Sequence, residues 1–254
     1  MDFLPLQQSR AYADALQRLG RMPRWVDNET ARMLVISRGT TLTSRGPLWR
    51  TQDAGEQTVF LRRFGPRIVN ADRTPPAVLR GAGYRQVITA ATVAVLSRSS
   101  PAHPKWDASR RCSHELSLST EALGTQHTEL LQQDRSQQKQ RRYRGLPPGF
   151  INAMSPDLEV HIARLQDRIV AWMIFARHPP TATYLMGCTT PDGRRSGAHH
   201  ALLHRARTAL AADVTDIDLG TIDTETAPGI ARFKLRSGAR VHQLGGTWLR
   251  VPGL

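Results

Sequence analysis

The residues with the clearest chemical potential form one run in the second half of the chain: Arg194, Arg195, Ser196, Gly197, Ala198 and His199. The surrounding pattern predicts that this run leaves a strand and enters a helix. The first N–H groups of a helix have no acceptor within it, and the helix dipole favours an anion there. Glycine allows close approach of the backbone, and arginine suits phosphate. The run therefore predicts a pyrophosphate site, although an exposed turn with ordinary charges would have the same sequence.

The elements around this run alternate between strands and helices. Apolar residues at helical spacing from Ala198 onward predict a helix of roughly 14 residues. Gln166-Asp167 predicts a hairpin turn, while Thr226 as N-cap, Pro228 in the first turn and Gly238 as the stop predict a second helix. Strands are expected at 159–165, 168–177, 182–188, 214–219 and 241–251, and a polar helix at 127–144.

The first half shows the same α/β alternation. Helices are expected at 9–19, 54–64 and 76–81, and strands at 32–37, 67–70, within 86–95 and at 115–119. Together the patterns predict an α/β (α+β) fold with a mixed central sheet flanked by helices. Pro101, His103 and Pro104 mark a linker region between the two halves of the chain.

Composition excludes several classes of protein. The 254 residues are 40% hydrophobic and 22% charged, which is typical of a globular protein and not of a disordered chain. Two cysteines far apart argue against a disulfide scaffold. No apolar stretch approaches the ~20 residues of a membrane span, and the N-terminus has no signal-peptide pattern. We therefore expect a cytoplasmic protein without a membrane span.

The charge balance indicates a partner with phosphate or carboxylate groups. There are 35 Lys and Arg residues against 21 Asp and Glu residues, a net charge of +14. Lysine occurs only at Lys105, Lys139 and Lys234, so arginine carries most of the charge. A phosphorylated cofactor, a nucleic acid or an acidic surface would each suit such a chain, and a proteome-wide arginine bias would explain it equally well.

The element order and the Arg194-x-x-Gly197 turn resemble the GNAT superfamily of acyl-CoA-dependent N-acyltransferases. The family signature ends on glycine or alanine, whereas this chain has His199 there. A narrower resemblance is to the Fem-type branch, which includes peptidoglycan-bridge aminoacyltransferases built from two GNAT-like halves. The segments that carry it are Tyr184–Cys188, Gly197–Leu203, Asp218–Gly220, Gly229–Lys234 with Gly238-Ala239, Pro5–Ser9 with Tyr12-Ala13, and Lys105-Trp106.

The resemblance implies a GNAT fold in two tandem halves, with residues 1–120 a degenerate half and residues 121–254 holding the acyl-donor site. It also implies direct attack of an amine on an acyl thioester, which needs a base and a donor for the carbonyl oxygen. Asp218 and Asp223 are the candidate bases at the end of a strand, and Tyr184 is the candidate hydrogen-bond donor. Asp218 could instead hold its loop by accepting N–H groups, Asp223 could cap a helix, and Tyr184 could be a core residue.

Other residues are candidates for binding the acceptor. His178 precedes Pro179, and Arg232 and Lys234 lie on the last predicted helix, where Ile230 and Phe233 should face the core and leave the two cations at an edge. We expect no metal site, because His199, His200 and His204 lack the further ligands that zinc requires.

We therefore expect an N-acyltransferase that moves an acyl group, by default acetyl, from acyl-CoA to a small-molecule or peptide amine. A Fem-type enzyme that uses aminoacyl-tRNA is the alternative, supported by the basic run 137–144, although no known RNA-binding motif is present. A GNAT-like binding module without turnover is the second alternative. The acceptor, the acyl length and the oligomeric state do not follow from the sequence.

Overall fold

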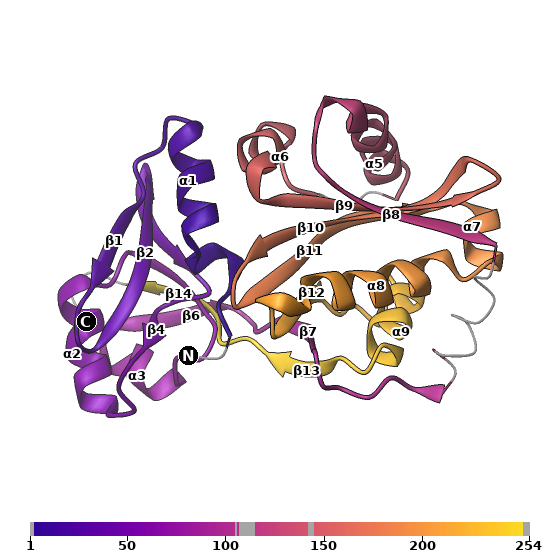
Figure 1. Cartoon of the computed structure of the whole chain (residues 1–254). Coiled ribbons are helices and arrows are strands. Elements are labelled where there is room, and N and C mark those ends of the chain that lie inside the picture. The colour runs from indigo at the N-terminus through magenta and orange to yellow at the C-terminus, as the bar shows by residue number, and fades with distance from the viewer. Residues whose placement is uncertain (1–2, 105, 107–114, 142–144, 251–254) are drawn as a thin grey trace. The chain divides into compact units, whose positions relative to one another are not determined.

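A computed structural model describes residues 3–104, 106, 115–141 and 145–250. The chain forms two compact units (Figure 1). The larger unit consists of residues 1–4 and 94–241, and the smaller unit consists of residues 5–93 and 242–254. The boundary expected after residue 120 lies within a strand of the larger unit, and the structure divides the chain at other places.

The larger unit is built on a mixed sheet with the strand order β8-β9-β10-β11-β12-β7-β13. Neighbouring strands from β8 to β11 are antiparallel, whereas β11 and β12 are parallel. The strands are β7 (Thr92–Ser97), β8 (Leu116–Ala122), β9 (Leu158–Leu165), β10 (Arg168–His178), β11 (Thr181–Thr189), β12 (Asp216–Thr221) and β13 (Arg240–Gln243).

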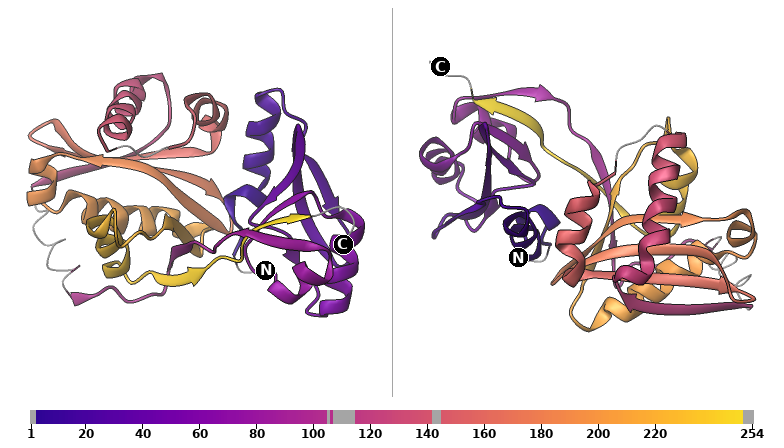
Figure 2. Two further views of the ribbon diagram at one scale, coloured as in Figure 1. Left: turned by 180° about the vertical axis from the view of Figure 1, so that it is seen from behind. Right: turned by 90° about the horizontal axis from the view of Figure 1, so that it is seen from above.

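Helices cover both faces of this sheet. In Figure 1, and from behind in Figure 2, α5 (Thr128–Arg141) and α6 (Pro148–Met154) lie on one face, and α8 (Ala198–Ala209) and α9 (Pro228–Arg236) lie on the other. The short α7 (Pro191–Arg195) precedes α8. The predicted polar helix continued to residue 144, but residues 142–144 lie outside the described residues.

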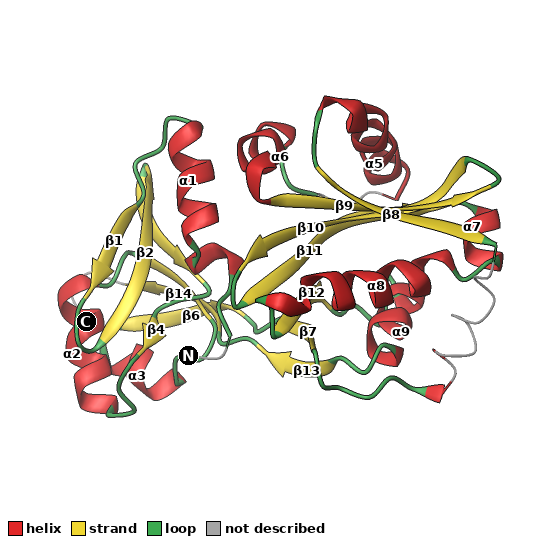
Figure 3. Cartoon of the chain, viewed as in Figure 1, coloured by secondary structure: helices red, strands yellow, loops and turns green. Residues whose placement is uncertain are grey.

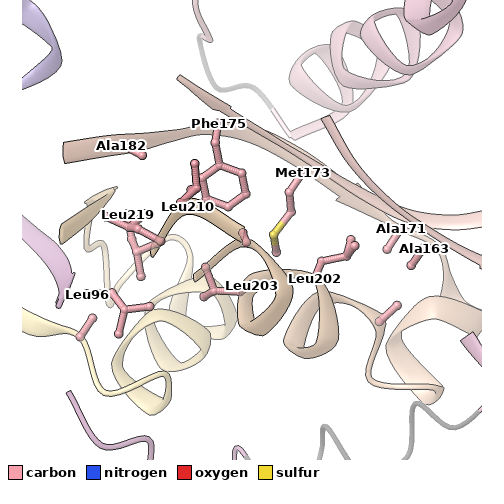
Figure 4. Packing of buried hydrophobic residues seen from close by; sticks show 14 of the residues in the cluster. Leu96, Ala163, Ala171, Met173, Phe175, Ala182, Leu202, Leu203, Leu210 and Leu219 are labelled. Atoms are coloured by element: carbon pink, nitrogen blue, oxygen red, sulfur yellow. The ribbon is translucent and has the colours of Figure 1, made fainter. Parts of the chain in front are cut away.

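The main core of the larger unit lies between the sheet and α8 (Figure 4). Met173 and Phe175 of β10 contact the apolar side of α8, where Leu202 and Leu203 are almost fully buried. Burying a large aliphatic or aromatic side chain contributes roughly 1.5–3 kcal/mol, so this cluster holds α8 in place. The predicted amphipathic helix beginning at Ala198 is therefore present, and its start is positioned by the core.

The smaller unit has a second mixed sheet, with the order β1-β2-β3-β5-β14-β6 and with β4 paired to β2. In this sheet β3 and β5 are the parallel pair. The strands are β1 (Arg24–Asp27), β2 (Ala31–Arg38), β3 (Thr40–Ser44), β4 (Leu48–Trp49), β5 (Ile68–Ala71), β6 (Tyr84–Ile88) and β14 (Gly246–Arg250). Helices α2 (Ala54–Phe64) and α3 (Pro76–Gly81) pack on one face through Phe60, Leu61, Val78 and Leu79, and α1 (Arg10–Arg18) lies on the other side of β2 (Figure 3).

At two places in the chain, consecutive strands belong to different sheets. Strand β7 follows β6 in sequence but pairs in the sheet of the larger unit, between β12 and β13. Strand β14 follows β13 in sequence but pairs in the sheet of the smaller unit, between β5 and β6. Each sheet is therefore completed by a strand whose sequence neighbour lies in the other sheet.

Local sequence signals account for several elements, but they predicted neither the short helix α7 nor the N-cap of α9. Gln166 and Asp167 both have positive φ, 48° and 65°, as a two-residue hairpin turn requires, so the predicted hairpin is confirmed. The polar turn expected before Arg194 contains α7, because Thr190 accepts the N–H of Gly193 and Pro191 begins the helix. Thr226 is not the N-cap of α9, since that position is Ala227.

Candidate functional site

The parallel strands β11 and β12 pair only at their beginnings. Their register joins Thr181–Thr183 to Asp216–Asp218 and stops there. Two residues further, the pairing of β11 with β10 shifts by one residue at Leu185, so that Ile174 faces Met186 and Phe175 faces Tyr184. Such a bulge bends a strand and frees its backbone groups from the ladder. Past the paired residues, the ends of the two parallel strands are free to line a cavity.

A cavity of about 760 Å³ lies at these strand ends. Its walls are the second half of β11, the end of β12, the beginning of α9 and one side of α5. The lining residues with functional side chains are Tyr184, Lys234, Asp223, Asp134, Gln137 and Gln138. Backbone contributes much of the remainder through Gly145, Gly187, Gly220 and Gly229. A largely apolar cavity with a few convergent polar side chains is the usual form of a small-molecule site.

Lys234 supplies the positive charge of this cavity. The residue is only 7% exposed, and its Nζ donates a hydrogen bond of 2.7 Å to the carbonyl of Thr221 at the end of β12. Burial lowers the pKa of Lys234 to about 8, against the opposing effect of nearby Asp218. An ammonium has three donors, so Lys234 keeps N–H groups beyond the one given to Thr221.

The burial of Lys234 differs from the sequence expectation. Ile230 and Phe233 were expected to face the core, with the cations at an edge. Ile230 is instead 47% exposed and lines the cavity together with Lys234, which lies four residues later on the same side of the helix. Phe233 packs against the core as expected, Ala231 is also buried, and Arg232 is exposed.

Asp218 holds the end of β12. The residue is 2% exposed, and its Oδ1 accepts the N–H of Gly220 at 2.8 Å. Both residues lie within β12, and Gly220 has a φ of 76°, a conformation that glycine adopts without strain. Asp218 does not line the cavity. This main-chain contact resembles the loop-holding role that the sequence analysis considered as the alternative to a base, although it lies within the strand.

Asp223 lines the cavity but is exposed and acts as a local cap. Its Oδ1 accepts the N–H groups of Glu225 at 2.9 Å and Thr226 at 2.8 Å, and the Thr226 hydroxyl donates to its Oδ2. These hydrogen bonds, first that of the Thr226 side chain, lower the pKa of Asp223. The carboxylate is therefore ionised and accessible from the cavity.

Tyr184 lies in the part of the cavity wall that β11 provides. Its ring packs against Phe175, with centroids 5.6 Å apart, and its hydroxyl lies over Gly187. A Cβ at Gly187 would come within 2.8 Å of this hydroxyl and 2.7 Å of the Trp172 carbonyl. Only glycine therefore leaves the tyrosine this position beside the cavity.

The predicted pyrophosphate turn has a defined but crowded geometry. Gly197 is the N-cap of α8, with a φ of 67°, and Ala198 after it is fully buried. The N–H groups of Ser196 and Gly197 already donate to the main-chain carbonyls of Asp192 and Arg194, respectively, at the end of α7. The first N–H groups of α8 have no acceptor within the helix. The residues from Arg194 to His199 are not among those that line the cavity beside Lys234.

The charged side chains of the turn have local partners. Arg194 Nη1 donates to the Thr189 carbonyl at 3.0 Å, and Arg195 pairs with Asp192. His199 Nε2 is 3.0 Å from the Cys188 carbonyl, and this carbonyl can only accept, so Nε2 carries the hydrogen. Burial lowers the pKa of His199 to about 4. A neutral imidazole thus ties the beginning of α8 to the end of β11.

Comparison with known families decides the class of this fold. The family model described as an acetyltransferase (GNAT) domain matches residues 107–235, which is half of the chain. The chain belongs to the GNAT acetyltransferase family. Among curated proteins there is no match. The GNAT fold expected from the sequence, with mixed sheets flanked by helices, is confirmed.

Solved structures share the fold of this GNAT protein at low sequence identity. FemX has a TM-score of 0.74 and 9% identity, with 97% of this chain and 92% of that chain covered. The C-terminal domain of a putative lysylphosphatidylglycerol synthetase from Agrobacterium fabrum has a TM-score of 0.63 and 14% identity, with 97% and 89% covered. L-PGS from Bacillus licheniformis has a TM-score of 0.61 and 13% identity, with 93% and 86% covered.

Two further residues that the sequence suggested for acceptor binding do not line the cavity beside Lys234. His178 is buried at the end of β10, where its Nε2 contacts the Thr183 hydroxyl at 2.9 Å. Arg232 is exposed on α9. Neither residue lines the cavity that holds Tyr184 and Lys234.

The run 137–144 was singled out from the sequence for its charge, but α5 was not placed at the cavity. Asp134, Gln137 and Gln138 line the cavity, and Gln138 Nε2 donates to the Asp134 carboxylate at 2.5 Å. Their spacing of three and four residues places them on one side of the helix, and this pattern was visible in the sequence. Within the described residues, no group of three or more His, Cys, Asp and Glu side chains is arranged to hold a metal ion, and no helix is both long and apolar enough to cross a bilayer.

The neutral state of His199 predicts a loss of stability in acid. The unfolded chain takes up a proton near pH 6.5, whereas the folded chain resists it down to a pKa of about 4. Unfolding therefore becomes easier as the pH falls from 6.5 to about 4, by up to about 3 kcal/mol for this residue. Urea unfolding at pH 7 and pH 4.5 measures the difference.

Two variants isolate His199 in this experiment. His199→Gln keeps an N–H donor for the Cys188 carbonyl but cannot be protonated, so its stability should depend less on pH. His204→Gln, at an exposed position on the same helix, serves as the control. An equal acid dependence in wild type and His199→Gln would contradict the prediction.

Proposed function

We propose that this GNAT protein is an N-acyltransferase and that acyl transfer takes place in the cavity between the ends of β11 and β12. The observation that carries the proposal is the buried Lys234 ammonium, which lines that cavity together with Tyr184. We assign the acyl-donor site to the larger unit for the same reason, and the smaller unit is then the degenerate GNAT-like half.

The proposed reaction is direct attack of an amine on the donor. The amine nitrogen bonds to the acyl carbonyl carbon, the bond from that carbon to the leaving sulfur breaks, and the proton lost by the amine ends on the departing thiol. Lys234 stabilises the negative charge that develops on the carbonyl oxygen. The Tyr184 hydroxyl is the candidate donor to the leaving group, and the ionised Asp223 is the accessible carboxylate that can receive the acceptor's proton.

Acyl-CoA, with acetyl as the default group, is the proposed donor. Its diphosphate would lie at the first N–H groups of α8, and its thioester would reach the cavity along the bulged part of β11. Arg194 and Arg195 lie beside that turn and are exposed. The small-molecule or peptide amine would enter from the α5 side, where Asp134 and the glutamines provide polar contacts.

A second donor, aminoacyl-tRNA, is favoured by one specific feature of the turn. The N–H groups of Ser196 and Gly197 are used inside the α7 turn, and the His199 imidazole is directed at the Cys188 carbonyl. This leaves fewer amides for a diphosphate than an open turn would provide. The same chemistry at Lys234 would then act on an ester of tRNA, with oxygen as the leaving atom. The cytoplasm, the compartment expected from the sequence, supplies both donors.

Binding and turnover with both donors test the proposal. If the turn holds the diphosphate, coenzyme A should bind at least tenfold more tightly than pantetheine, which lacks it, in isothermal titration. Acetyl-CoA should then be consumed with a panel of amines. Aminoacyl-tRNA binding should weaken steeply with salt in a filter assay. Binding and consumption of neither donor would overturn the transferase proposal and leave a binding module without turnover.

A further inference from the structure

The smaller unit contains a second cavity, of about 830 Å³, with a basic lining. It lies at the ends of α2 and α3 and along the beginning of β6. Three of its lining residues are arginines, Arg62, Arg80 and Arg85, and none is acidic. We propose that this cavity is a binding site for a phosphate group carried by a small molecule or by a lipid headgroup.

The three guanidinium groups have few partners of their own. Arg62 donates from Nε and Nη2 to the Gly81 carbonyl, at 3.1 Å and 2.8 Å, which fixes its planar group at the cavity. Arg62 retains three of its five N–H donors. Arg80 and Arg85 are exposed, and their guanidinium groups have no ion pair or hydrogen bond with any described residue. The cavity therefore has unused donors and uncompensated positive charge.

The charge of the whole unit strengthens this inference. Residues 5–93 and 242–254 contain fifteen arginines, no lysine and six carboxylate side chains. Like charges repel across such a surface, so gathering three arginines around one hollow has an electrostatic cost that a bound anion removes. Arginine is also the side chain whose planar fork matches phosphate geometry.

The floor of the cavity argues against a nucleic-acid strand as the ligand. Single-stranded nucleic acids are usually held by stacking of bases on exposed aromatic rings. The aromatic lining residues here, Tyr84 and Trp248, are each 1% exposed, and their polar atoms donate to the carbonyls of Pro66 and Gly245. The cavity thus recognises the phosphate and offers no surface for a base.

Two features of this region suit two different carriers of the phosphate, which experiment can distinguish. The cavity volume admits a phosphorylated metabolite. Strand β6 also exposes Val87 and Ile88, at 56% and 60%, directly after Arg85 and Gln86, and exposed aliphatic residues beside arginines suit the headgroup region of an anionic membrane.

Binding of phosphate probes to the full chain tests the site without reference to acyl transfer. Inorganic phosphate and glycerol 3-phosphate are titrated calorimetrically against wild type and against Arg80→Gln/Arg85→Gln, which leaves the Arg62 contact with Gly81 intact. We expect Kd to rise at least tenfold in this variant. The control, Arg21→Gln/Arg24→Gln, removes the same charge from exposed positions of the same unit and should change Kd less than twofold.

Vesicles distinguish the two carriers. Wild type is sedimented with phosphatidylcholine vesicles, with and without about one quarter phosphatidylglycerol. Binding of the free phosphate probes assigns a metabolite, and binding to the anionic vesicles alone assigns a headgroup, provided that Arg80→Gln/Arg85→Gln abolishes it and the control does not. The proposed site would be overturned if neither the phosphate probes nor the anionic vesicles bound. It would also be overturned if both variants lost binding equally, or if single-stranded RNA were the only ligand that bound.

Discussion

Lys234→Met is expected to lower kcat about 10²–10³-fold, the usual effect of removing one group that stabilises a developing oxyanion. Methionine has a similar length and no charge, so it fills the buried space of Lys234 beside Thr221 without its donors. Donor binding at the α7–α8 turn does not involve Lys234, and the Kd for coenzyme A should change little. Steady-state kinetics and titration of the same samples separate the two effects.

The pH profile distinguishes an ammonium that stabilises charge from an amine that acts as a base. Because the pKa of Lys234 is lowered to about 8, its ammonium is lost as the pH rises through that value. Wild-type kcat should therefore fall above about pH 8. Lys234→Arg, which stays charged, should keep partial activity without the alkaline fall. A wild-type rate that instead rises above pH 8 would contradict the assigned role.

A fragment of residues 121–254 is expected not to fold, although the domain division predicted from the sequence makes it the active half. The fragment lacks β7, which pairs between β12 and β13, and most of β8. It also carries β14, whose partners β5 and β6 are absent. Loss of Ala94 and Leu96 from the core exposes the face of α8 that they cover.

The size of this effect follows from the energy of core residues. Removing one large buried side chain costs about 2–5 kcal/mol, and a whole domain is stable by only about 5–15 kcal/mol. Deleting a strand from the middle of a sheet removes several buried side chains at once, so the free energy lost exceeds the stability of the domain. The fragment should therefore show poor amide dispersion in NMR spectra and no cooperative thermal transition.

Residues 92–243 provide the matched control, since they contain every strand of the larger sheet and omit β14. We expect this fragment to unfold cooperatively. Folding of 121–254 with native-like dispersion would show that β7 is dispensable and would favour the division at residue 120.

Much of the local structure was predictable because its signals lie within a few residues of one another. The Gln166-Asp167 hairpin, the apolar spacing of α8 and the Gly238 stop of α9 each follow from steric rules or periodicity. The GNAT resemblance depended on such local segments and their order. The run from Arg194 to His199 was also recognisable as a strand-to-helix connection, although the sequence did not reveal that α7 would occupy part of it.

The candidate site was only partly predictable. Tyr184, Asp223 and Lys234 were singled out from the sequence and line one cavity in the structure. The buried position of Lys234 was not foreseen, because helical periodicity alone does not show which side of α9 faces a cavity and which faces the core.

By itself the sequence determined the elements, their order and the family, since these depend on short-range propensities and on residue types at fixed spacing. Only the tertiary structure decided which strands complete which sheet, that α5 joins the cavity wall and that the charge of Lys234 is buried. Pairings such as β14 with β5 join residues almost 180 positions apart, for example Trp248 with Val69. Such contacts are selected by packing of the whole chain, and no local pattern encodes them.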